Sequence, residues 1–206
     1  MFTNRTSAGE RLADELRRQE LGADLVLAIP RGGLPVGRPV ADALGVPLDV
    51  VVAKKIGAPG NPELAVAAVA DDGTLWRNES LIGALDLTEE YVAAERERER
   101  VAAKEKFDRY RADRPPLDLT GTRVVIVDDG LATGATMRAC LRRVVDGGAG
   151  SVVVAVPVGS PDTVAALESV ADAVVALEQP PGFRAVGQYY RDFGQVSDED
   201  AMAYLQ

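Results

Sequence analysis

Short runs of apolar, mostly branched residues recur along the chain, and longer segments of mixed polarity separate them. The runs lie at 25–29, 48–53, 124–127, 151–157 and 173–177. They are too short for helices and show little polar alternation, which is the pattern of strands buried on both faces of a sheet. Composition predicts helices at about 7–21, capped by Ser7, at 34–44 and 136–145, and from Ser160 onwards. This alternation predicts an α/β protein with a parallel sheet and right-handed crossovers.

The segment 54–77 interrupts the alternation. Its first part, IGAPGNPEL, is rich in glycine and proline and is predicted to form neither helix nor strand. It is a candidate mobile lid over a ligand site. The segments 64–70 and 74–77 then have the composition of a hairpin, joined by Asp71-Asp72-Gly73.

A long charged segment follows at 88–111. Thr88 is predicted to cap a helix that has Glu89 and Glu90 in its first turn, where the helix dipole favours acids. The run ERERER is typical of a solvated face rather than a binding patch. Two roles remain open for this helix, which could cover a ligand site or contact another subunit.

Composition narrows the classes of function. The chain has 206 residues, which fits one domain over 1–206, a net charge of −9 and no histidine. The charge argues against a nucleic-acid partner, since such proteins usually carry a basic face, and the lack of histidine excludes Ser-His-Asp catalysis. The single cysteine, Cys140, is expected in the core. No run is long enough to span a bilayer and the N-terminus does not resemble a signal peptide, so we expect a soluble, cytoplasmic protein without a membrane partner.

The most informative stretch is VVIVDDGLATGAT, from Val124 to Thr136. The apolar run ends in Asp128 and Asp129, and a loop of small and hydroxyl-bearing residues then leads into a helix. Such a loop points several backbone N–H groups at one place, and the positive end of the helix makes that place a phosphate site. The candidate ligand contacts in the loop are Leu131, Ala132, Thr133, Gly134, Ala135 and Thr136.

Two other predicted strands also end in candidate ligand groups. Arg31 is followed by Gly32 and Gly33, a cation beside glycines that permit close backbone approach, which suits a second phosphate group. Lys54 and Lys55 follow the next strand. Because ligands of parallel sheets bind at the carboxyl ends of strands, we expect the three segments to form one site. The alternative is ordinary turns with solvated charges.

These segments resemble the motifs of the type I phosphoribosyltransferases, which use phosphoribosyl pyrophosphate (PRPP). The strand, acidic pair and T-G-x-T loop are similar to the PRPP motif of that family, with Ala135 where many members have a second glycine. The resemblance implies that 133–136 hold the 5′-phosphate and that Asp128 and Asp129 contact the ribose hydroxyls. It also implies a pyrophosphate loop at 30–33, often with a non-proline cis peptide, and pyrophosphate contacts from Lys54 or Lys55.

The implied fold is the Rossmann-like parallel sheet of that family, flanked by helices, with a small C-terminal hood at 179–206. In the family a variable hood stacks on the nucleobase, and Tyr189, Tyr190 and Phe193 are candidate aromatic faces, with Tyr189 as the candidate substrate contact. An equally good interpretation is that these rings only fix the tail to the core.

The resemblance implies a Mg²⁺-dependent reaction in which PRPP loses pyrophosphate and a small nitrogenous acceptor, a nucleobase in our leading hypothesis, attacks C1′. Arg31, Asp128 and Asp129 are the candidate catalytic residues, and the two acids are candidate Mg²⁺ contacts, directly or through water. Consecutive strand residues point to opposite faces, so one acid could contribute more than the other. A non-catalytic sensor of PRPP or of a nucleotide, and a hydrolase or phosphorylase of a ribose phosphate, remain alternatives. A homodimer is compatible with this assignment.

Overall fold

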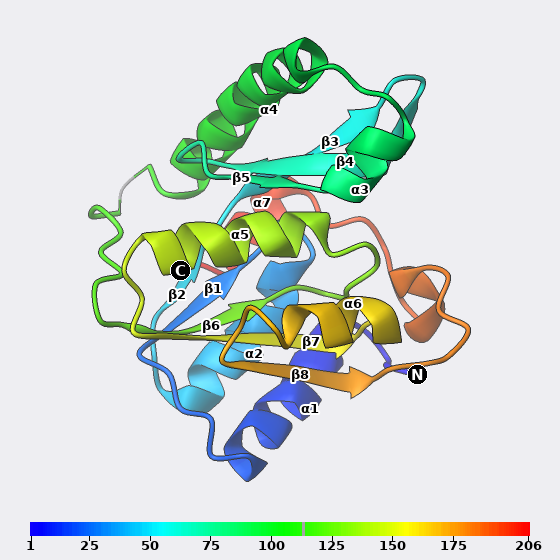
Figure 1. Cartoon of the computed structure of the whole chain (residues 1–206). Helices are drawn as coiled ribbons and strands as arrows, with labels where there is room; N and C mark the ends of the chain where they lie inside the picture. The colour runs from blue at the N-terminus through cyan, green and yellow to red at the C-terminus, as the bar shows by residue number, and fades with distance from the viewer. Residues whose placement is uncertain (113) are drawn as a thin grey trace.

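A sheet of five parallel strands runs through the centre of the protein, as the computed structural model shows for residues 1–112 and 114–206 (Figure 1). The strands are β1 (Leu25–Ala28), β2 (Leu48–Val50), β6 (Arg123–Val127), β7 (Ser151–Val158) and β8 (Ala173–Glu178). Their order is β2-β1-β6-β7-β8, and every neighbouring pair is parallel. The order reverses between β1 and β6. The loops that follow these two strands therefore lie side by side, where ligands bind in such sheets.

Helices cover both faces of this sheet. They are α1 (Arg5–Arg18) and α2 (Gly33–Leu44) on one face, and α5 (Ala135–Asp146) and α6 (Pro161–Leu167) on the other. Alternate residues of a strand point to opposite faces. Val125 of β6 thus joins the core beneath α1 and α2, whereas Val124 and Ile126 join the core beneath α5 and α6. Burial on both faces explains the unbroken apolar runs.

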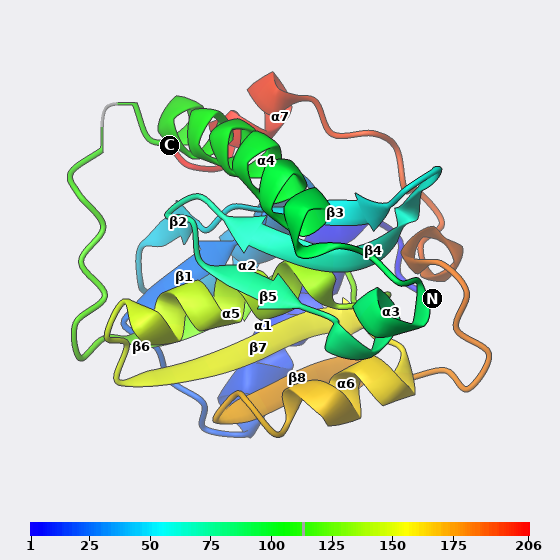
Figure 2. The ribbon, with the colours of Figure 1, turned by 45° about the horizontal axis from the view of Figure 1, so that its top comes forward.

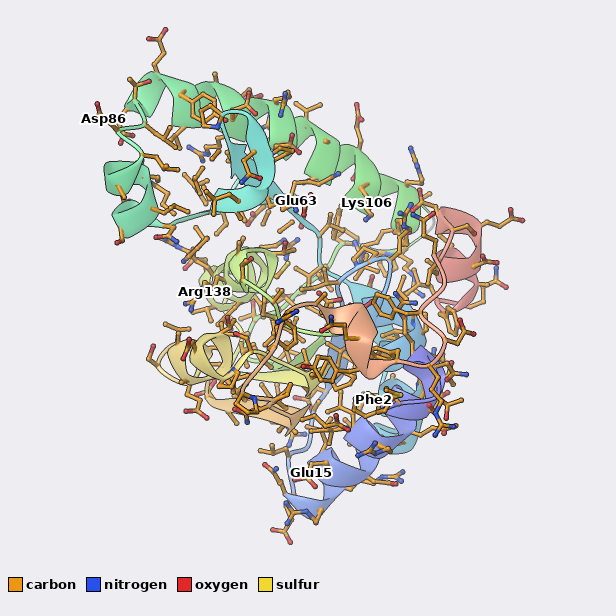
Figure 3. The ribbon with its side chains drawn as sticks, turned by 90° about the vertical axis from the view of Figure 1, so that its right-hand side faces the viewer. Phe2, Glu15, Glu63, Asp86, Lys106 and Arg138 are labelled. Atoms are coloured by element: carbon orange, nitrogen blue, oxygen red, sulfur yellow. The ribbon has the colours of Figure 1, made fainter. Side chains whose placement is uncertain are left out.

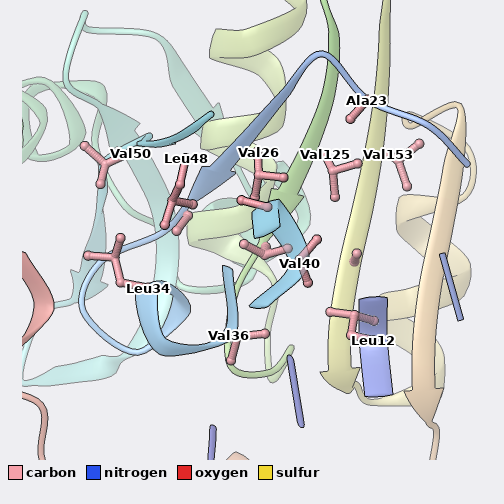
Figure 4. Close-up of a cluster of buried hydrophobic side chains, with 14 of the residues drawn as sticks. Leu12, Ala23, Val26, Leu34, Val36, Val40, Leu48, Val50, Val125 and Val153 are labelled. Carbon is pink, nitrogen blue, oxygen red and sulfur yellow. The ribbon is translucent and has the colours of Figure 1, made fainter. Parts of the chain in front are cut away.

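Figure 4 shows part of the core between the sheet and α1 and α2. Val26, Val125 and Val153 come from three adjacent strands, Leu12 comes from α1, and Val40 comes from α2. Burying a side chain of this size contributes roughly 1.5–3 kcal/mol relative to leaving it exposed. The packed sheet is therefore a firm base for the loops at its edge.

A second sheet, antiparallel, lies over α5 (Figures 1 and 2). Its strands are β3 (Ala53–Ala58), β4 (Asn61–Ala70) and β5 (Leu75–Arg77), and α3 (Glu79–Ala84) and α4 (Glu89–Tyr110) pack against them. Ala65 and Ala68 of β4 meet Ala135 and Ala139 of α5, and these small side chains let the sheet approach the helix closely. We call residues 53–110 the antiparallel layer.

The antiparallel layer corrects one prediction. The segment IGAPGNPEL is not irregular, because β3 and β4 form a hairpin there, and Lys54 and Lys55 lie inside β3 rather than at the end of a central strand. Register shifts at 56–58 accommodate the proline of β4, and a Cβ on Gly57 would lie 2.5 Å from Cα of Pro62. Cross-strand pairing thus overrides the glycine-rich composition. The predicted hairpin with Asp71-Asp72-Gly73 at its turn is confirmed.

The N-terminal caps of α1 and α4 can be compared with the caps predicted from the sequence. Asn4, not Ser7, caps α1, because the Asn4 side chain accepts from the Ser7 backbone N–H at 2.8 Å and Ser7 Oγ accepts from the Asn4 N–H at 3.1 Å. The prediction therefore placed the cap one turn late, on the second member of a capping box. Thr88 caps the long charged helix α4 as predicted.

The C-terminal tail contains a 3₁₀ turn, η1 (Val186–Tyr189), and a short helix, α7 (Asp198–Ala203). The tail is fixed to the start of the chain, since the Phe2 N–H donates to the Tyr189 carbonyl at 2.7 Å and the Arg191 N–H donates to the Phe2 carbonyl at 2.9 Å. The rings of Phe2 and Phe193 pack on Tyr190, which is buried. Cys140 is buried in α5 as predicted. Among the helices described here, none combines the length and the hydropathy needed to cross a membrane.

Candidate active site

A cavity of about 430 Å³ opens between the central sheet and the antiparallel layer. Pro30 after β1, Asp128 after β6 and Thr136 at the start of α5 line one side of it, and Lys54 and Lys55 of β3 line the other. The three predicted segments thus meet at one place, although Lys54 and Lys55 reach it from within β3 rather than from the end of a central strand. The charged helix α4 also lines this cavity, through Arg98 and Glu99. Of the two roles left open for this helix, covering the ligand site is the one that the geometry supports.

In the part of the chain that the structure describes, the loop between β6 and α5 presents backbone donors without a hydrogen-bond partner. Gly134 is the N-cap residue that precedes α5, with φ at +73°, and no side chain among the described residues caps this helix. The Arg138 N–H donates to the Gly134 carbonyl at 2.9 Å, so the N–H groups of 135–137 precede the first helical bond. Thr163 holds the loop in place, because its hydroxyl donates to the Ala132 carbonyl at 2.7 Å. This geometry suits an anion at the helix start.

Leu131 was predicted as a ligand contact, and the structure shows that this prediction is wrong. Its side chain is buried in the core beneath α5 and α6. Its N–H donates to the Val158 carbonyl at 2.9 Å, and its carbonyl accepts from the Ser160 N–H at 2.9 Å. Both backbone groups therefore serve the connection to β7. The neighbouring Ala132 and Thr133 are exposed.

The two acids after β6 point to different surroundings. Asp128 borders the cavity, and its Oδ1 accepts from the Asp129 backbone N–H at 2.8 Å. Asp129 Oδ2 instead accepts from Arg5 Nε at 2.8 Å, and the guanidinium of Arg5 lies 3.8 Å from the centre of the Phe193 ring. The Tyr190 hydroxyl donates to the Asp129 carbonyl at 2.7 Å. Asp129 thus ties α1 and the tail to the end of β6.

Burial dominates the ionisation of this acidic pair. It raises the pKa of Asp128 well above the ordinary value, and the charge of Asp129 raises it further, while Arg5 and Lys106 act in the opposite direction. Burial also raises the pKa of Asp129, and the bond from Arg5 partly offsets that effect. Asp128 is therefore a half-buried carboxylate whose charged form would be stabilised by a cation or by hydroxyl donors in the cavity.

The loop after β1 approaches these acids so closely that it requires glycine. The peptide bond between Pro30 and Arg31 is cis, as the family resemblance implies. A Cβ on Gly32 would lie 2.0 Å from Asp129 Oδ2, and a Cβ on Gly33 would lie 2.8 Å from the Val127 carbonyl oxygen. These contacts explain why two glycines follow Arg31.

A second cavity of about 420 Å³ lies beside the first and shares Pro30 and Lys54 with it. Cationic side chains supply much of its wall, namely Arg31, Lys54, Lys106 and Arg109, and Glu105 and Asp198 are the acids in it. Lys54 thus borders both cavities, whereas Lys55 pairs with Glu63, with Nζ 2.7 Å from Oε2.

Two contributors to the site, Arg5 and Lys106, were not predicted from the sequence, and Tyr190 was predicted as an aromatic face rather than as a contact of Asp129. Arg5 and Tyr190 contact Asp129, and nothing in the sequence around either residue signals this. Lys106 had a signal, because it follows Ala103 by three residues and precedes Tyr110 by four, and such residues share one face of a helix. Both of those neighbours are buried.

The aromatic residues of the tail pack largely on one another. Tyr190 is buried, Phe193 lies under Arg5, and Tyr189 stacks on Phe183 with ring centres 5.6 Å apart. The interpretation that these rings fix the tail to the core therefore holds for Tyr190 and Phe193. Tyr189 is half-buried.

The chain offers no preformed metal cage among residues 1–112 and 114–206, where no group of three or more potential metal-ligating side chains converges. Of the acids that line the first cavity, Glu63 and Glu99 come from the antiparallel layer, and Asp128 is the one at the end of β6, beside the phosphate loop. Hard oxygen ligands of this type suit Mg²⁺. The donor set fits a metal that receives most of its ligands from water and from a phosphorylated substrate.

Sequence and structure comparisons place the protein in a class. Residues 3–191 match the family model described as the phosphoribosyl transferase domain. The chain belongs to this family, and its parallel sheet with flanking helices is the type I phosphoribosyltransferase fold.

Individual relatives agree with this assignment. The chain is 42% identical over 205 residues to the Mycobacterium tuberculosis protein named "Putative phosphoribosyl transferase Rv0571c", covering 100% of this chain and 46% of the relative. The chain thus spans about half the length of this curated relative. The crystal structure of TT1426 from Thermus thermophilus is 46% identical, with a TM-score of 0.84, and covers 100% of this chain and 97% of TT1426. A purine phosphoribosyltransferase from Pyrococcus horikoshii shares the fold, at 21% identity and a TM-score of 0.50, over 93% of this chain and 91% of that one.

Proposed function

We propose that this protein is a Mg²⁺-dependent phosphoribosyltransferase that moves the phosphoribosyl group of PRPP to a small nitrogenous acceptor, with a nucleobase as the leading candidate. The observation that carries this proposal is the meeting of Asp128, Thr136, Pro30 and Lys54 around one cavity. That cavity combines a phosphate loop, an acid and a cation, which are the groups that would bind PRPP. We expect the reaction to take place in the cytoplasm.

The donor would be held at its two phosphorylated ends. The N–H groups at 133–136 and the hydroxyls of Thr133 and Thr136 would hold the 5′-phosphate. The 30–33 loop, with Arg31 and Lys54, would hold the pyrophosphate. Asp128 would accept from the ribose hydroxyls between these ends. Fixing both ends positions C1′ for attack before the reaction begins.

The residues of the site also match the charges that develop during transfer. Positive charge grows on the ribose ring, and the carboxylate of Asp128 would stabilise it, while negative charge grows on the departing pyrophosphate next to Arg31 and Lys54. Mg²⁺, when bound, would supply further positive charge to the pyrophosphate. Asp128 would face this metal, directly or through water. Asp129, bonded to Arg5, would hold the strand end and the tail in place.

A steady-state assay tests this proposal. PRPP and Mg²⁺ are incubated with a panel of purines, pyrimidines and other amines, and pyrophosphate release is followed. We expect release that depends on one class of acceptor. Failure of every acceptor, together with no PRPP binding by calorimetry, would refute the proposal.

One observation favours a second candidate, a PRPP- or nucleotide-sensing protein on the same fold. Asp129 is occupied by Arg5, so only one acid of the pair borders the cavity. PRPP binding by the wild-type protein without turnover of any acceptor would select this candidate over the transferase.

A further inference from the structure

Lys106 is a half-buried cation whose bonding capacity is mostly unused. Its ammonium group carries three N–H donors. Among the described residues it makes one hydrogen bond, from Nζ to the Pro30 carbonyl at 2.9 Å, and no ion pair within 4 Å. Buried charges are normally paired. The surroundings of Lys106 therefore favour an anion that the chain itself does not supply.

Neighbouring cations add to this imbalance. Burial, followed by the charge of Lys54, lowers the pKa of Lys106 to about 8, and Arg31 acts in the same direction, whereas Asp198 and Asp128 act in the opposite one. A polyanion in the second cavity would lie among Lys106, Lys54 and Arg31 at once. It would neutralise charges that now repel one another.

Asp198 is the carboxylate that partly compensates these cations. It comes from α7, at the far end of the chain, and Figure 3 shows Lys106 on the end of α4 that lies next to α7. Asp198 accepts from the Tyr110 hydroxyl at 2.6 Å and from Arg109 Nη1 at 3.1 Å, and it lies 4.0 Å from Arg31 Nη1. The Asp198 carboxylate thus pairs with two cations, Arg31 and Arg109.

We propose that Lys106 binds the pyrophosphate group of the donor directly and that Asp198 competes with this anion for the same cations. The proposal rests on the proposed function for the identity of the donor. Its geometry does not depend on the acceptor, because the second cavity is lined by Pro30 and Arg31 of the pyrophosphate loop and shares Pro30 and Lys54 with the first cavity. The antiparallel layer would then supply two cations, Lys54 and Lys106, to the leaving group.

Calorimetric titration with inorganic pyrophosphate and Mg²⁺ tests the inference on the full chain. We expect Lys106→Met to weaken binding by about tenfold or more, since a charge-assisted hydrogen bond is lost. Lys104→Met is the matched control, because Lys104 lies on the same helix, is exposed and pairs with Asp108. It should bind as the wild type does. Equal affinity of the Lys106→Met and wild-type proteins, or no binding by the wild type, would overturn the inference.

A second variant separates ligand binding from a structural role of Lys106. Asp198→Asn keeps a hydrogen-bond acceptor for Tyr110 but removes the competing charge, so pyrophosphate should bind about threefold to tenfold more tightly. Unchanged or weaker binding would contradict the competition. Lys106→Arg, which keeps the charge, should retain most of the affinity. If Lys106→Met does not fold, as judged by thermal unfolding, these two variants decide the question.

The two proposals can fail separately. Pyrophosphate binding that depends on Lys106, without transfer to any acceptor, would sustain the inference and refute the transferase. PRPP-dependent transfer that is unaffected by Lys106→Met would do the reverse.

Discussion

The central sheet and the antiparallel layer contribute to the same cavity by different means. The sheet offers backbone groups and one acid at the ends of β1 and β6, held by loops in which a Cβ on Gly32 would meet Asp129 at 2.0 Å. The layer offers long cationic side chains, Lys54 from β3 in this cavity and Lys106 from α4 in the second cavity beside it. The contribution of the sheet is therefore fixed by backbone packing, whereas that of the layer depends on charge and can be adjusted by ligands and by pH.

Exchanging the acids of the sheet should give the largest effect. Asp128→Asn should lower the turnover number about 10²- to 10³-fold, because the developing positive charge on the ribose loses its carboxylate. Asp129→Asn should instead lower the thermal unfolding midpoint, since Arg5 loses its charged partner. Steady-state kinetics and thermal unfolding of both variants check this division. Equal losses of turnover in the two variants would show that both acids act on the substrate.

A substitution of one glycine in the phosphate loop tests the backbone contribution of the central sheet alone. Gly134→Ala places a side chain at φ +73°, with its Cβ 2.5 Å from Thr163 Cγ2. The left-handed conformation costs about 1–2 kcal/mol for alanine, and the free protein can relieve this strain by moving the loop away from the binding conformation. We therefore expect PRPP binding to weaken about tenfold. Gly182→Ala is the control, because nothing lies within 4 Å of its added Cβ. Calorimetry with PRPP checks both, and an unaffected Gly134→Ala protein would place the 5′-phosphate elsewhere.

The two lysines of β3 provide a matched pair in the antiparallel layer. Lys54 borders both cavities, whereas Lys55 pairs with Glu63, whose side chain is 84% exposed. We expect Lys54→Met to weaken pyrophosphate binding about fivefold to tenfold and Lys55→Met less than about twofold, because an exposed ion pair contributes little. The reverse order in a calorimetric titration would assign the anion to the hairpin tip.

The pH dependence of pyrophosphate binding should give the smallest effect. It should separate the contribution of the antiparallel layer from that of the central sheet. The pKa of Lys106 is about 8, and the charged groups facing it are Lys54, Arg31, Asp198 and Asp128. Below pH 8 its ammonium is charged in the free protein, and above pH 8 it loses its proton unless an anion retains it. The affinity for pyrophosphate should therefore fall by up to about tenfold per pH unit above about 8. In titrations between about pH 7 and about pH 9.5, Lys106→Met should reduce the dependence of the affinity on pH. The same pH dependence in the variant and in the wild type would show that Lys106 does not contact the anion.

The sequence predicts the part of the site that the central sheet supplies better than the part that the antiparallel layer supplies. Runs such as 124–127 are buried on both faces, so their strand character and the position of Asp128 follow from local composition. The contact between Asp129 and Arg5 joins residues 124 positions apart. The hairpin at 53–63 was missed because pairing with β4 overrides its glycines and prolines. Lys106 was missed because most of its helix is charged and solvated. That composition gives little sign of the face, with Ala103 and Tyr110, that packs on the core of the central sheet.

The alanine contacts between β4 and α5 limit how a closed state could form. Lifting the whole antiparallel layer would separate Ala65 and Ala68 from Ala135 and Ala139, and would expose a tightly packed apolar seam to water. Bending at the hairpin end alone leaves that seam intact. Its turn contains Gly60, at φ +73°, with nothing within 4 Å of an added Cβ. Any opening and closing of the cavity would thus involve only a few residues at the end of the hairpin, while the rest of the antiparallel layer stays packed on α5.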